Sequence, residues 1–376
     1  MLRFRSMTSL CVFLSLLTGM AASQQKAATD QKAGDTAGGV SPESAVPELT
    51  IEVVKRERIA GIPPAMPTLE PTFPLPDGGM LVRIVHLPTT QPDPVHLFKF
   101  DPEMYRIKSA QEINRFDDFY PGLSDVISDG KVAVSKNQVV LLVHAITNDE
   151  KRNAPDTPPH QFLVFYDFNG RQQKVAAVDV SPQVSAMGVF GNGEILIVDN
   201  TYPGDNSLRK HLRVYDDKGE FQKELFQDKP DTGGKKGGRS PLPIGDVKAI
   251  FPYGDNVLVV YGSENGLLLD EMSPSGVVRE WDLVLPQNAV AFGLIPSDGP
   301  YWLVSYEKAG AAPFGAHHLD GIFEFDKTTS APVANLTSSS SGILMGAVYE
   351  HAGEIVGLLN DPKDYSEQFA VAKIGK

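Results

Sequence analysis

Residues 185–225 read SAMGVFGNGEILIVDNTYPGDNSLRKHLRVYDDKGEFQKEL, and this stretch decides the fold. It contains an apolar strand, an Asn-Gly turn and a second strand that ends in Asp199. A Tyr-Asp pair, a turn with glycine and a further strand follow. Glycine, Asn and Asp permit the tight reversals of β-hairpins, and the alternating apolar side chains indicate half-buried strands. The stretch therefore predicts short antiparallel strands in one small sheet.

The same turn and strand recur six times along the chain. Successive copies end 58, 55, 62, 45 and 54 residues apart. A hairpin with an aromatic residue or Leu before Asp follows each of the first five copies. Repeats of roughly 50 residues with four short strands are typical of propeller blades. A β-sandwich of unrelated hairpins is the alternative, but it does not explain the regular spacing. The six copies end at His86, His144, Asp199, Tyr261, Tyr306 and Asn360.

The sixth copy is one strand short. Residues 367–376 (EQFAVAKIGK) supply its third strand, and residues 50–60 (TIEVVKRERIA) resemble a strand that has no other partner. We expect this N-terminal strand to complete the last blade, because closure removes exposed sheet edges. The sequence thus predicts an all-β fold, a six-bladed β-propeller over residues 48–376 closed by an N-terminal strand. A short helix is expected at 108–116, between the first two blades.

Residues 185–225 resemble an NHL-type repeat. The resemblance lies in the order of apolar strand, Asn-Gly turn, strand ending in Asp, aromatic-Asp pair, glycine turn and final strand. The whole domain is accordingly similar to the six-bladed propellers of the NHL and TolB-like superfamily, with the clear match in the third blade. This resemblance implies the fold, and a fold does not by itself specify an activity.

The N-terminus predicts export. Residues 1–23 combine two arginines, a short apolar run and a small-residue ending, Ala21-Ala22-Ser23. A membrane-spanning helix needs about 20 apolar residues, so a cleaved signal peptide is the better interpretation and a retained anchor the alternative. Residues 24–47 are small, polar and proline-containing, which predicts a disordered linker. We therefore expect a periplasmic or secreted protein.

Charge and cysteine content exclude several function classes. The chain has 34 Lys and Arg against 47 Asp and Glu, a net charge of −13, so nucleic acid is a disfavoured partner. The one cysteine, Cys11, lies in the expected leader, which leaves no cysteine for a disulfide, a thiolate nucleophile or a metal site. No second apolar run is long enough to span a membrane.

Polar side chains follow the second strand of each repeat, where the loops of a propeller face its central channel. Polar groups that converge at such a mouth can form a ligand site. The alternative is that Asp and Asn here cap strands and satisfy turn amides. The candidate ligand-binding residues are His86, His144, Asn148, Asp199, Asn200, Glu264, Glu307, Asn360 and Asp361.

A metal site is a second interpretation of the same rim. Calcium and other hard divalent cations prefer oxygen ligands, and four rim residues offer them. The resemblance to propeller hydrolases of the gluconolactonase and strictosidine synthase type implies such a cation and an ester or lactone substrate. The first blade lacks the characteristic Glu of those enzymes and has Arg83 and His86 instead. The candidate metal ligands are Asp199, Asn200, Glu307 and Asp361.

No Walker A loop, dinucleotide fingerprint, G-x-S-x-G or H-E-x-x-H motif occurs in the chain. We therefore expect a ligand- or protein-binding module without its own catalytic site or cofactor. Its partner would be a protein, a peptide or a small molecule. A metal-dependent propeller hydrolase and a structural subunit of a cell-envelope complex are the two alternatives.

Overall fold

In the computed structural model, all described residues belong to the unit Val46–Lys376. Within its described part, no helix is long and apolar enough to cross a membrane. The expected leader and all of the expected linker except residues 46 and 47 lie outside the described residues. The described residues are 46–60, 72–76, 78–86, 101–116, 122–127, 131–154, 158–181, 183–201, 209–227, 247–308, 319–338, 341–360 and 367–375.

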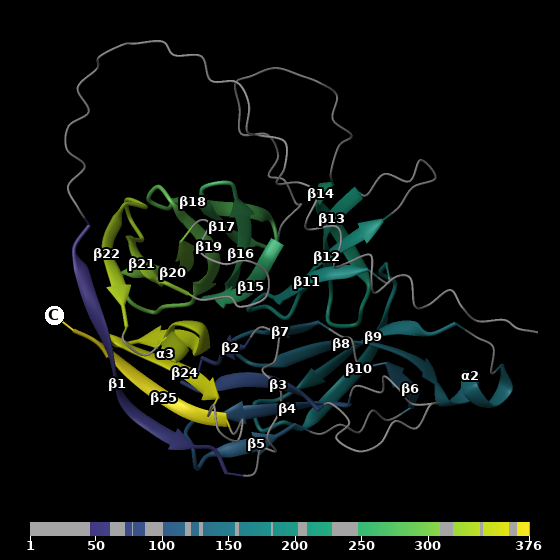
Figure 1. Ribbon diagram of the computed structural model, residues 1–376. Helices are drawn as coiled ribbons and strands as arrows, with labels where there is room; N and C mark the ends of the chain where they lie inside the picture. Colours follow the sequence, from purple (N-terminus) through teal and green to yellow (C-terminus); the bar gives the residue numbers. More distant parts are fainter. Residues whose placement is uncertain are drawn as a thin grey trace, which may run out of the picture. The chain divides into compact units, whose positions relative to one another are not determined.

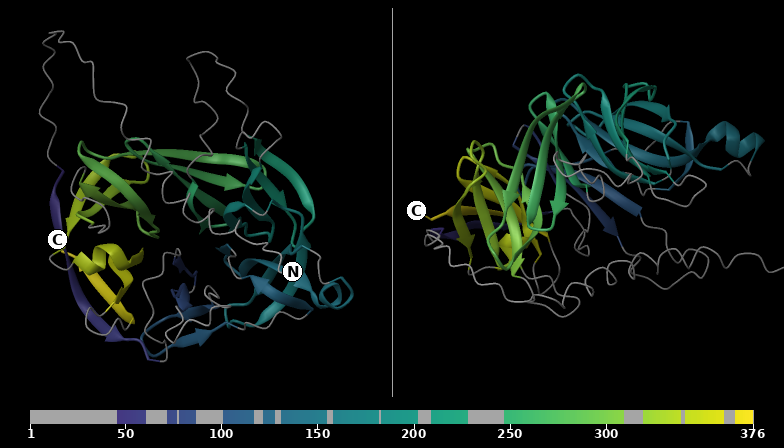
Figure 2. Two further views of the ribbon diagram at one scale, coloured as in Figure 1. Left: turned by 45° about the vertical axis from the view of Figure 1, so that its right-hand side comes forward. Right: turned by 90° about the horizontal axis from the view of Figure 1, so that it is seen from above.

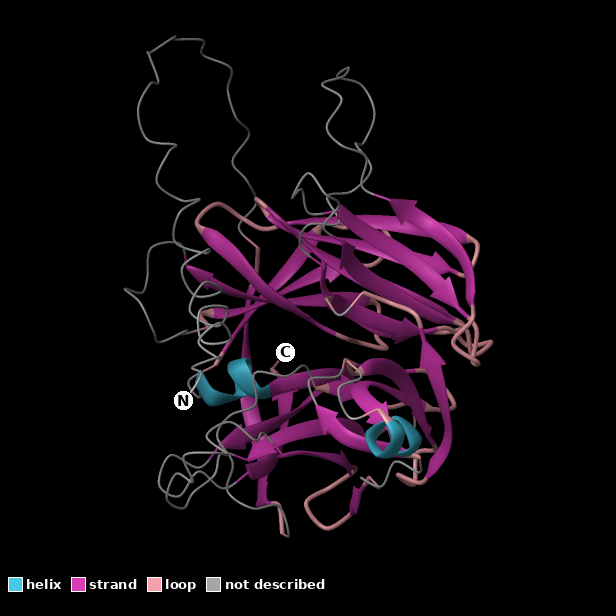
Figure 3. Cartoon of the chain, turned by 90° about the vertical axis from the view of Figure 1, so that its right-hand side faces the viewer, coloured by secondary structure: helices cyan, strands magenta, loops and turns pink. Residues whose placement is uncertain are grey.

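The fold is all-β, and the described residues form only two helices, α2 (Asn148–Asn153) and α3 (Ser341–Gly346) (Figure 3). The first sheet contains β2 (Phe73–Pro74), β3 (Met80–His86), β4 (Asp101–Ile107) and β5 (Ile113–Arg115). The second contains β6 (Leu123–Ile127), β7 (Val132–Val134), β8 (Val139–Thr147), β9 (His160–Tyr166) and β10 (Gln172–Val178). The third contains β11 (Val184–Val189), β12 (Ile195–Thr201), β13 (Arg209–Tyr215) and β14 (Phe221–Gln227).

Two further sheets complete the domain. The fourth contains β15 (Val247–Tyr253), β16 (Asn256–Ser263), β17 (Gly266–Ser273) and β18 (Gly276–Val284). The last has eight strands in the order β19-β20-β21-β22-β1-β25-β24-β23. Its strands are β19 (Ala289–Ile295), β20 (Tyr301–Lys308), β21 (Gly321–Asp326), β22 (Pro332–Thr337), β1 (Glu48–Arg58), β25 (Glu367–Ile374), β24 (Glu354–Asn360) and β23 (Ala347–His351).

The recurring Asp closes a hairpin turn. Asp167, Asp216 and Asp326 each accept a hydrogen bond at Oδ1 from the backbone N–H two residues further on, at 2.8–2.9 Å. Such Asx turns stabilise a reversal that the backbone would otherwise form alone. In the preceding turn of the third sheet, Gly193 has φ 91°, a region that favours glycine. The hairpins predicted from the third repeat are therefore observed.

β1, the first strand of the chain, lies beside the C-terminal strand β25 in one sheet (Figure 1). It pairs antiparallel with β25, from Ile51 opposite Ile374 to Arg58 opposite Gln368. Its first residues, Glu48 to Thr50, pair in parallel with β22. The pairing of the N-terminal strand with the C-terminal strand, predicted from the missing strand of the last repeat, is thus present in the structure.

The first strands of the sheets approach one another, and the sheets surround them in a β-propeller-like arrangement (Figure 2). β7 and β11 both contact β15, and β23 contacts both β19 and β2. Apolar side chains fill the space between neighbouring sheets. Leu163 of the second sheet, for example, packs in one buried cluster with Ile195 and Ile197 of the third. Burial of such clusters is the main force that holds the sheets together.

Each sheet has two ends. At the hairpin end, the first strand of a sheet is joined to the second. At the loop end, the second strand is joined to the third. In the second sheet, β7, β8 and β9 are these three strands. At the hairpin end, Phe73 of β2 contacts Phe251 of β15, with ring centroids 6.2 Å apart and an interplanar angle of 62°. Both residues are buried, at 5% and 6% exposure. The first and fourth sheets therefore touch across the interior, although two other sheets lie between them in sequence.

The prediction of a helix at 108–116 is wrong. Residues 108–112 form a turn in which the backbone N–H groups of Gln111 and Glu112 donate to Ser109 Oγ. The backbone N–H of Lys108 donates to Glu112 O at 3.0 Å, and β5 follows and pairs with β4. The serine hydroxyl competes for amides that a helix would need, which favours the turn.

Candidate functional site

The predicted rim residues occupy the loop end of their sheets. His86 ends β3, His144 lies in β8, and Asp199 and Asn200 lie in β12. Glu307 and Asn360 lie near the ends of β20 and β24. The side chains of His86 and Asn360, and all of Asp361, lie outside the described residues. Whether the set converges on a ligand stays a prediction.

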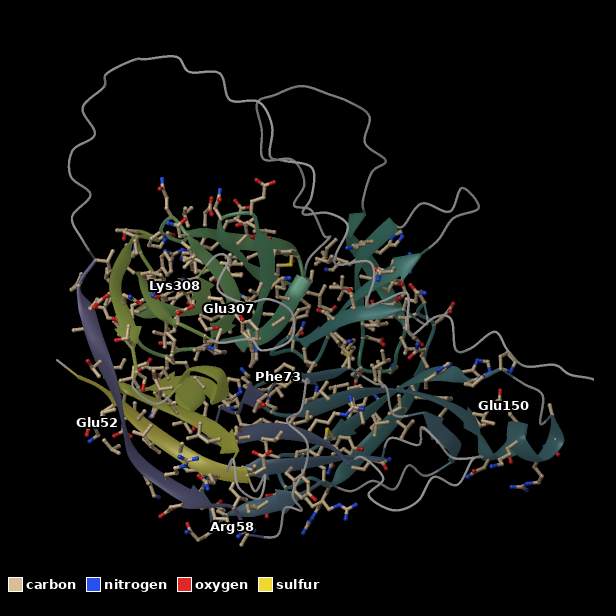
Figure 4. All side chains as sticks on the ribbon, viewed as in Figure 1. Glu52, Arg58, Phe73, Glu150, Glu307 and Lys308 are labelled. Carbon is tan, nitrogen blue, oxygen red and sulfur yellow. The ribbon has the colours of Figure 1, made fainter. Side chains whose placement is uncertain are left out.

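On the second sheet, the predicted residues shape the local loop. His144 Nε2 lies 3.0 Å from the carbonyl oxygen of Pro159. Asn148 opens α2, whose N-cap Thr147 forms a reciprocal capping box with Glu150. The hydrogen bonds that Glu150 accepts from the backbone N–H and hydroxyl of Thr147 lower its pKa. α2 buries no residue, and Figure 4 shows Glu150 on this projecting helix.

Asp199 is fully buried and belongs to a polar network on the third sheet. Its Oδ2 accepts a hydrogen bond from Arg213 Nη1 at 3.1 Å and one from the backbone N–H of Ser181 at 3.4 Å. Glu224 extends the network: its Oε1 lies 2.5 Å from His211 Nδ1 and 3.9 Å from Arg213 Nε. Asp199 Oδ1 is buried without a hydrogen-bond partner in the described structure. A buried carboxylate of this kind needs its paired cation.

His211, Arg213 and Glu224 were not among the residues predicted from the sequence. The signal lies in the strand register, because Asp199 pairs directly with His211 on β13. Residues 211 and 213 alternate with apolar Leu212 and Val214, which places them on one face of the strand. That face carries Asp199, and Glu224 is opposite Arg213 on β14. The pairing of β12, β13 and β14 thus assembles the network.

The remaining predicted residues differ in their surroundings. Glu264 is exposed in the turn between β16 and β17. Glu307 is half-buried on β20 and pairs with Val290 on β19. Its neighbour Lys308 donates its backbone N–H to Asp320 Oδ2 at 2.7 Å, which fixes the base of the loop that follows β20. Figure 4 shows Glu307 and Lys308 together on this part of the sheet.

The prediction of a metal site can be compared with the described part of the chain only for Asp199, Asn200 and Glu307. In that part of the chain, no group of three or more His, Cys, Asp or Glu side chains is arranged to hold a metal ion. Of the four predicted ligands, Asp199 pairs with Arg213, and Asp361 lies outside the described residues. The metal hypothesis therefore stays untested.

Among the described first strands of the sheets, β19 is the one that exposes large apolar side chains. Val290 is 55% exposed and Phe292 is 49% exposed. Side chains of directly paired residues in antiparallel strands lie on the same face about 4.5–5.5 Å apart, so Val290 lies beside Glu307. An inner strand would ordinarily bury such side chains, as β15 buries Ile250 and Phe251. The pair Val290 and Phe292, with Glu307 beside it, is the candidate site.

At the hairpin end, three contacts join different sheets. Phe73 and Phe251 meet there, and Lys136 forms an ion pair with Asp255 across the second and fourth sheets. The backbone N–H of Gly191 donates to Asp255 O at 2.8 Å, which draws in the third sheet as well. These contacts therefore join the first four sheets at the hairpin end.

No family model and no curated protein matches the chain. Solved structures that resemble it include a protein of unknown function from Dyadobacter fermentans, at 11% identity and a TM-score of 0.46, over 86% of this chain and 99% of that chain. The PQQ-bound aldose sugar dehydrogenase from Streptomyces coelicolor matches at 9% identity and a TM-score of 0.40, over 88% and 100%. The β-propeller domain of the Trilobed protease from Pyrococcus furiosus matches at 10% identity and a TM-score of 0.36, over 68% of each chain. Similarities at this level carry no argument about function.

Proposed function

We propose that this protein is a secreted or periplasmic binding module that takes a protein, peptide or small-molecule ligand at the loop end of its first strands, without a catalytic site of its own. The observation that supports this proposal is the difference between the hairpin end and the loop end of the sheets. Phe73 and Phe251 pack together at the hairpin end, whereas Val290 and Phe292 stay exposed on β19. Exposed apolar side chains beside a few polar groups are typical of ligand sites.

We also propose that the β-propeller domain has six blades. The order of the eight-stranded sheet divides into β19 to β22 and a second group of β1, β25, β24 and β23. β1 links these groups through its three parallel pairs with β22. With the four separate sheets, this division gives six units that follow the six sequence repeats. Membership of the NHL and TolB-like superfamily is the part of the proposal that rests on residues 185–225 alone.

The chemistry of the candidate site defines the class of ligand. Val290 and Phe292 offer partly exposed apolar surface, and Glu307 places a carboxylate beside Val290. The chain carries a net charge of −13, so its field attracts cations and repels polyanions. We therefore favour a ligand with an apolar part and a hydrogen-bond donor or positive charge, such as a basic peptide or an amine.

Thermal unfolding with a ligand panel tests the proposal. A ligand that binds the native state raises the midpoint of unfolding through mass action. The panel contains basic and acidic peptides, amines, neutral sugars, lactones, calcium and zinc. A ligand that raises the unfolding midpoint of the wild-type protein should no longer do so in Phe292→Ser and Val290→Ser. It should still raise the midpoint in Phe221→Ser and Val278→Ser. The latter two side chains are 56% and 58% exposed on the outer strands β14 and β18, which makes them matched controls.

Two outcomes would contradict the proposal. A hit whose shift survives in both inner-strand variants would place binding elsewhere. A shift that only calcium or zinc produces would favour the metal-dependent hydrolase instead. Export is tested separately by sequencing the N-terminus of the mature protein, which the proposal expects to begin after Ser23.

A further inference from the structure

β1 fills a slot between two strand edges that do not pair with each other. In the eight-stranded sheet it lies between β22 and β25, and no pairing joins those two strands directly. Without β1, each would present a row of unpaired backbone N–H and C=O groups. Such an edge accepts an added extended strand. The slot is therefore a strand-binding site, which a segment of the same chain occupies here.

Few side chains hold β1 in this slot. Ile51 is its one fully buried residue within Glu48–Arg58, at 1% exposure, and it packs in a cluster with Leu336 and Ala372. Leu49 and Val53 are partly buried against the same cluster. The register then shifts between Val53 and Lys55, which leaves Val54 51% exposed.

The rest of β1 faces solvent. Glu52, Lys55, Arg56 and Arg58 are exposed, so the strand carries a charged outer face. Its attachment depends on backbone hydrogen bonds and on apolar side chains at alternating positions 49, 51 and 53. A segment with the same alternation would make the same contacts, and β1 of a second copy has that alternation by identity.

The chain between β1 and β2 is long enough to reach a neighbour. Residues 59–72 connect the two strands, and the backbone N–H of Ile59 still donates to Glu367 O of β25. At about 3.3–3.6 Å per residue, the 13 residues that follow Ile59 can span up to roughly 45 Å when extended. A neighbouring copy whose slot lies within that reach can therefore receive β1.

We propose that β1 of one copy can occupy the slot between β22 and β25 of a second copy, so that this chain forms a reciprocally exchanged dimer. Each copy would keep every contact described for β1 and the bond of Ile59 to Glu367 O, and only the path of residues 60–72 would differ. Exchange of an identical element between protomers is a low-cost route to a dimer. The inference does not depend on the proposed ligand site, which lies on β19.

Disulfide trapping tests the exchange directly. Glu52 pairs with Lys373, and both are exposed, so Glu52→Cys and Lys373→Cys are made as two separate single variants. Each also carries Cys11→Ser, which leaves no other cysteine. The two variants are unfolded in urea, mixed, refolded at high concentration and oxidised. The control mixture pairs Glu52→Cys with Val278→Cys, an exposed position on β18 that β1 does not contact.

The exchange predicts much more disulfide-linked dimer in the mixture of Glu52→Cys and Lys373→Cys than in the control mixture. This dimer should disappear on reduction. Equal dimer in both mixtures, or none, would overturn it. A second measurement needs no cysteine. Isotopically heavy and light wild-type chains, refolded together at high concentration, should give a dimer of mixed mass by native mass spectrometry. Monomers alone at every concentration would contradict the proposal.

Discussion

The rings of Phe73 and Phe251 meet edge to face, 6.2 Å apart, although their strands β2 and β15 belong to the first and fourth sheets. This contact joins the two sheets at the hairpin end, whereas Val290 and Phe292 stay exposed on β19. It also ties together sheets that share no strand. The pair is therefore both a part of the core and the reason why we place the ligand at one end.

Replacing Phe251 by Ala should lower the free energy of unfolding by about 3–5 kcal/mol, because a buried aromatic ring is lost and a cavity remains. Phe73→Ala should have a similar effect. Edge-to-face pairs contribute about 0.5–1.5 kcal/mol beyond their burial, so the double variant should lose less than the sum of the single losses by that amount. Urea unfolding of the four proteins measures the coupling. Strict additivity would show that the rings do not interact.

Gly191 permits the close approach of the third and fourth sheets. A Cβ at this position would lie 2.9 Å from Asp255 Cα, closer than side-chain carbon atoms tolerate. We expect Gly191→Ala to destabilise the protein by about 1–3 kcal/mol, as overpacking does. Gly342 of α3 is the matched control, since its added Cβ would make ordinary contact at 3.7 Å. Gly342→Ala should be neutral or stabilising by up to about 1 kcal/mol. Equal effects of the two variants in urea unfolding would contradict this explanation.

The regular turns made the fold accessible from the sequence. Asp216 and Gly219 mark a hairpin by local chemistry alone, and residues 50–60 show their need for a partner by their strand pattern. Contacts between sheets had no such signal. Phe73 and Phe251 are 178 positions apart, and nothing local to either indicates that they meet. Residues 108–116 were misassigned because a serine side chain favours a turn over a helix there.

The candidate site was predictable only in part. The spacing of the repeats identified Glu307 and its place near the end of a second strand. It could not identify Val290 or Phe292, because apolar residues in a strand are ordinarily buried and exposure depends on how neighbouring sheets pack. Asp199 was predicted as a ligand, and its ion pair with Arg213 required the register of β12 and β13.

Asp199 should contribute strongly to stability. Its fully buried carboxylate pairs with Arg213, so Asp199→Ala leaves Arg213 with the longer contact to Glu224 and should cost about 3 kcal/mol. Asp217 is the matched control, because it forms an exposed ion pair with Lys174. Such pairs contribute about 0–1 kcal/mol, and Asp217→Ala should change little. Chemical unfolding of the two variants decides this. A loss at Asp199 no larger than that at Asp217 would contradict a structural role.

Glu367 should contribute stability that falls as the pH rises toward neutrality. Burial raises the pKa of the Glu367 carboxyl from 4.5 to about 7, and burial together with Glu350 raises the pKa of Glu324. A carboxyl with a higher pKa in the folded state binds its proton more tightly there. The contribution of Glu367 is therefore fully present below its unfolded pKa and is lost as the pH rises through about 7.

Glu367→Gln should remove that part of the pH dependence, because the amide stays neutral. Urea midpoints measured from below pH 4.5 to above pH 7 should decline less in the variant than in the wild-type protein. The variant should also be the more stable of the two at the alkaline end. Parallel profiles for the two proteins would show that Glu367 does not titrate in this range.

Titration with Nile red, a neutral dye that fluoresces in apolar surroundings, tests the central claim that ligands bind at Val290 and Phe292. We expect saturable fluorescence with the wild-type protein, loss of most of it in Phe292→Ser, and wild-type behaviour in Phe221→Ser. The two phenylalanines are 49% and 56% exposed, so they differ in position rather than in accessibility. Equal loss in both variants, or no loss in Phe292→Ser, would contradict the proposed site.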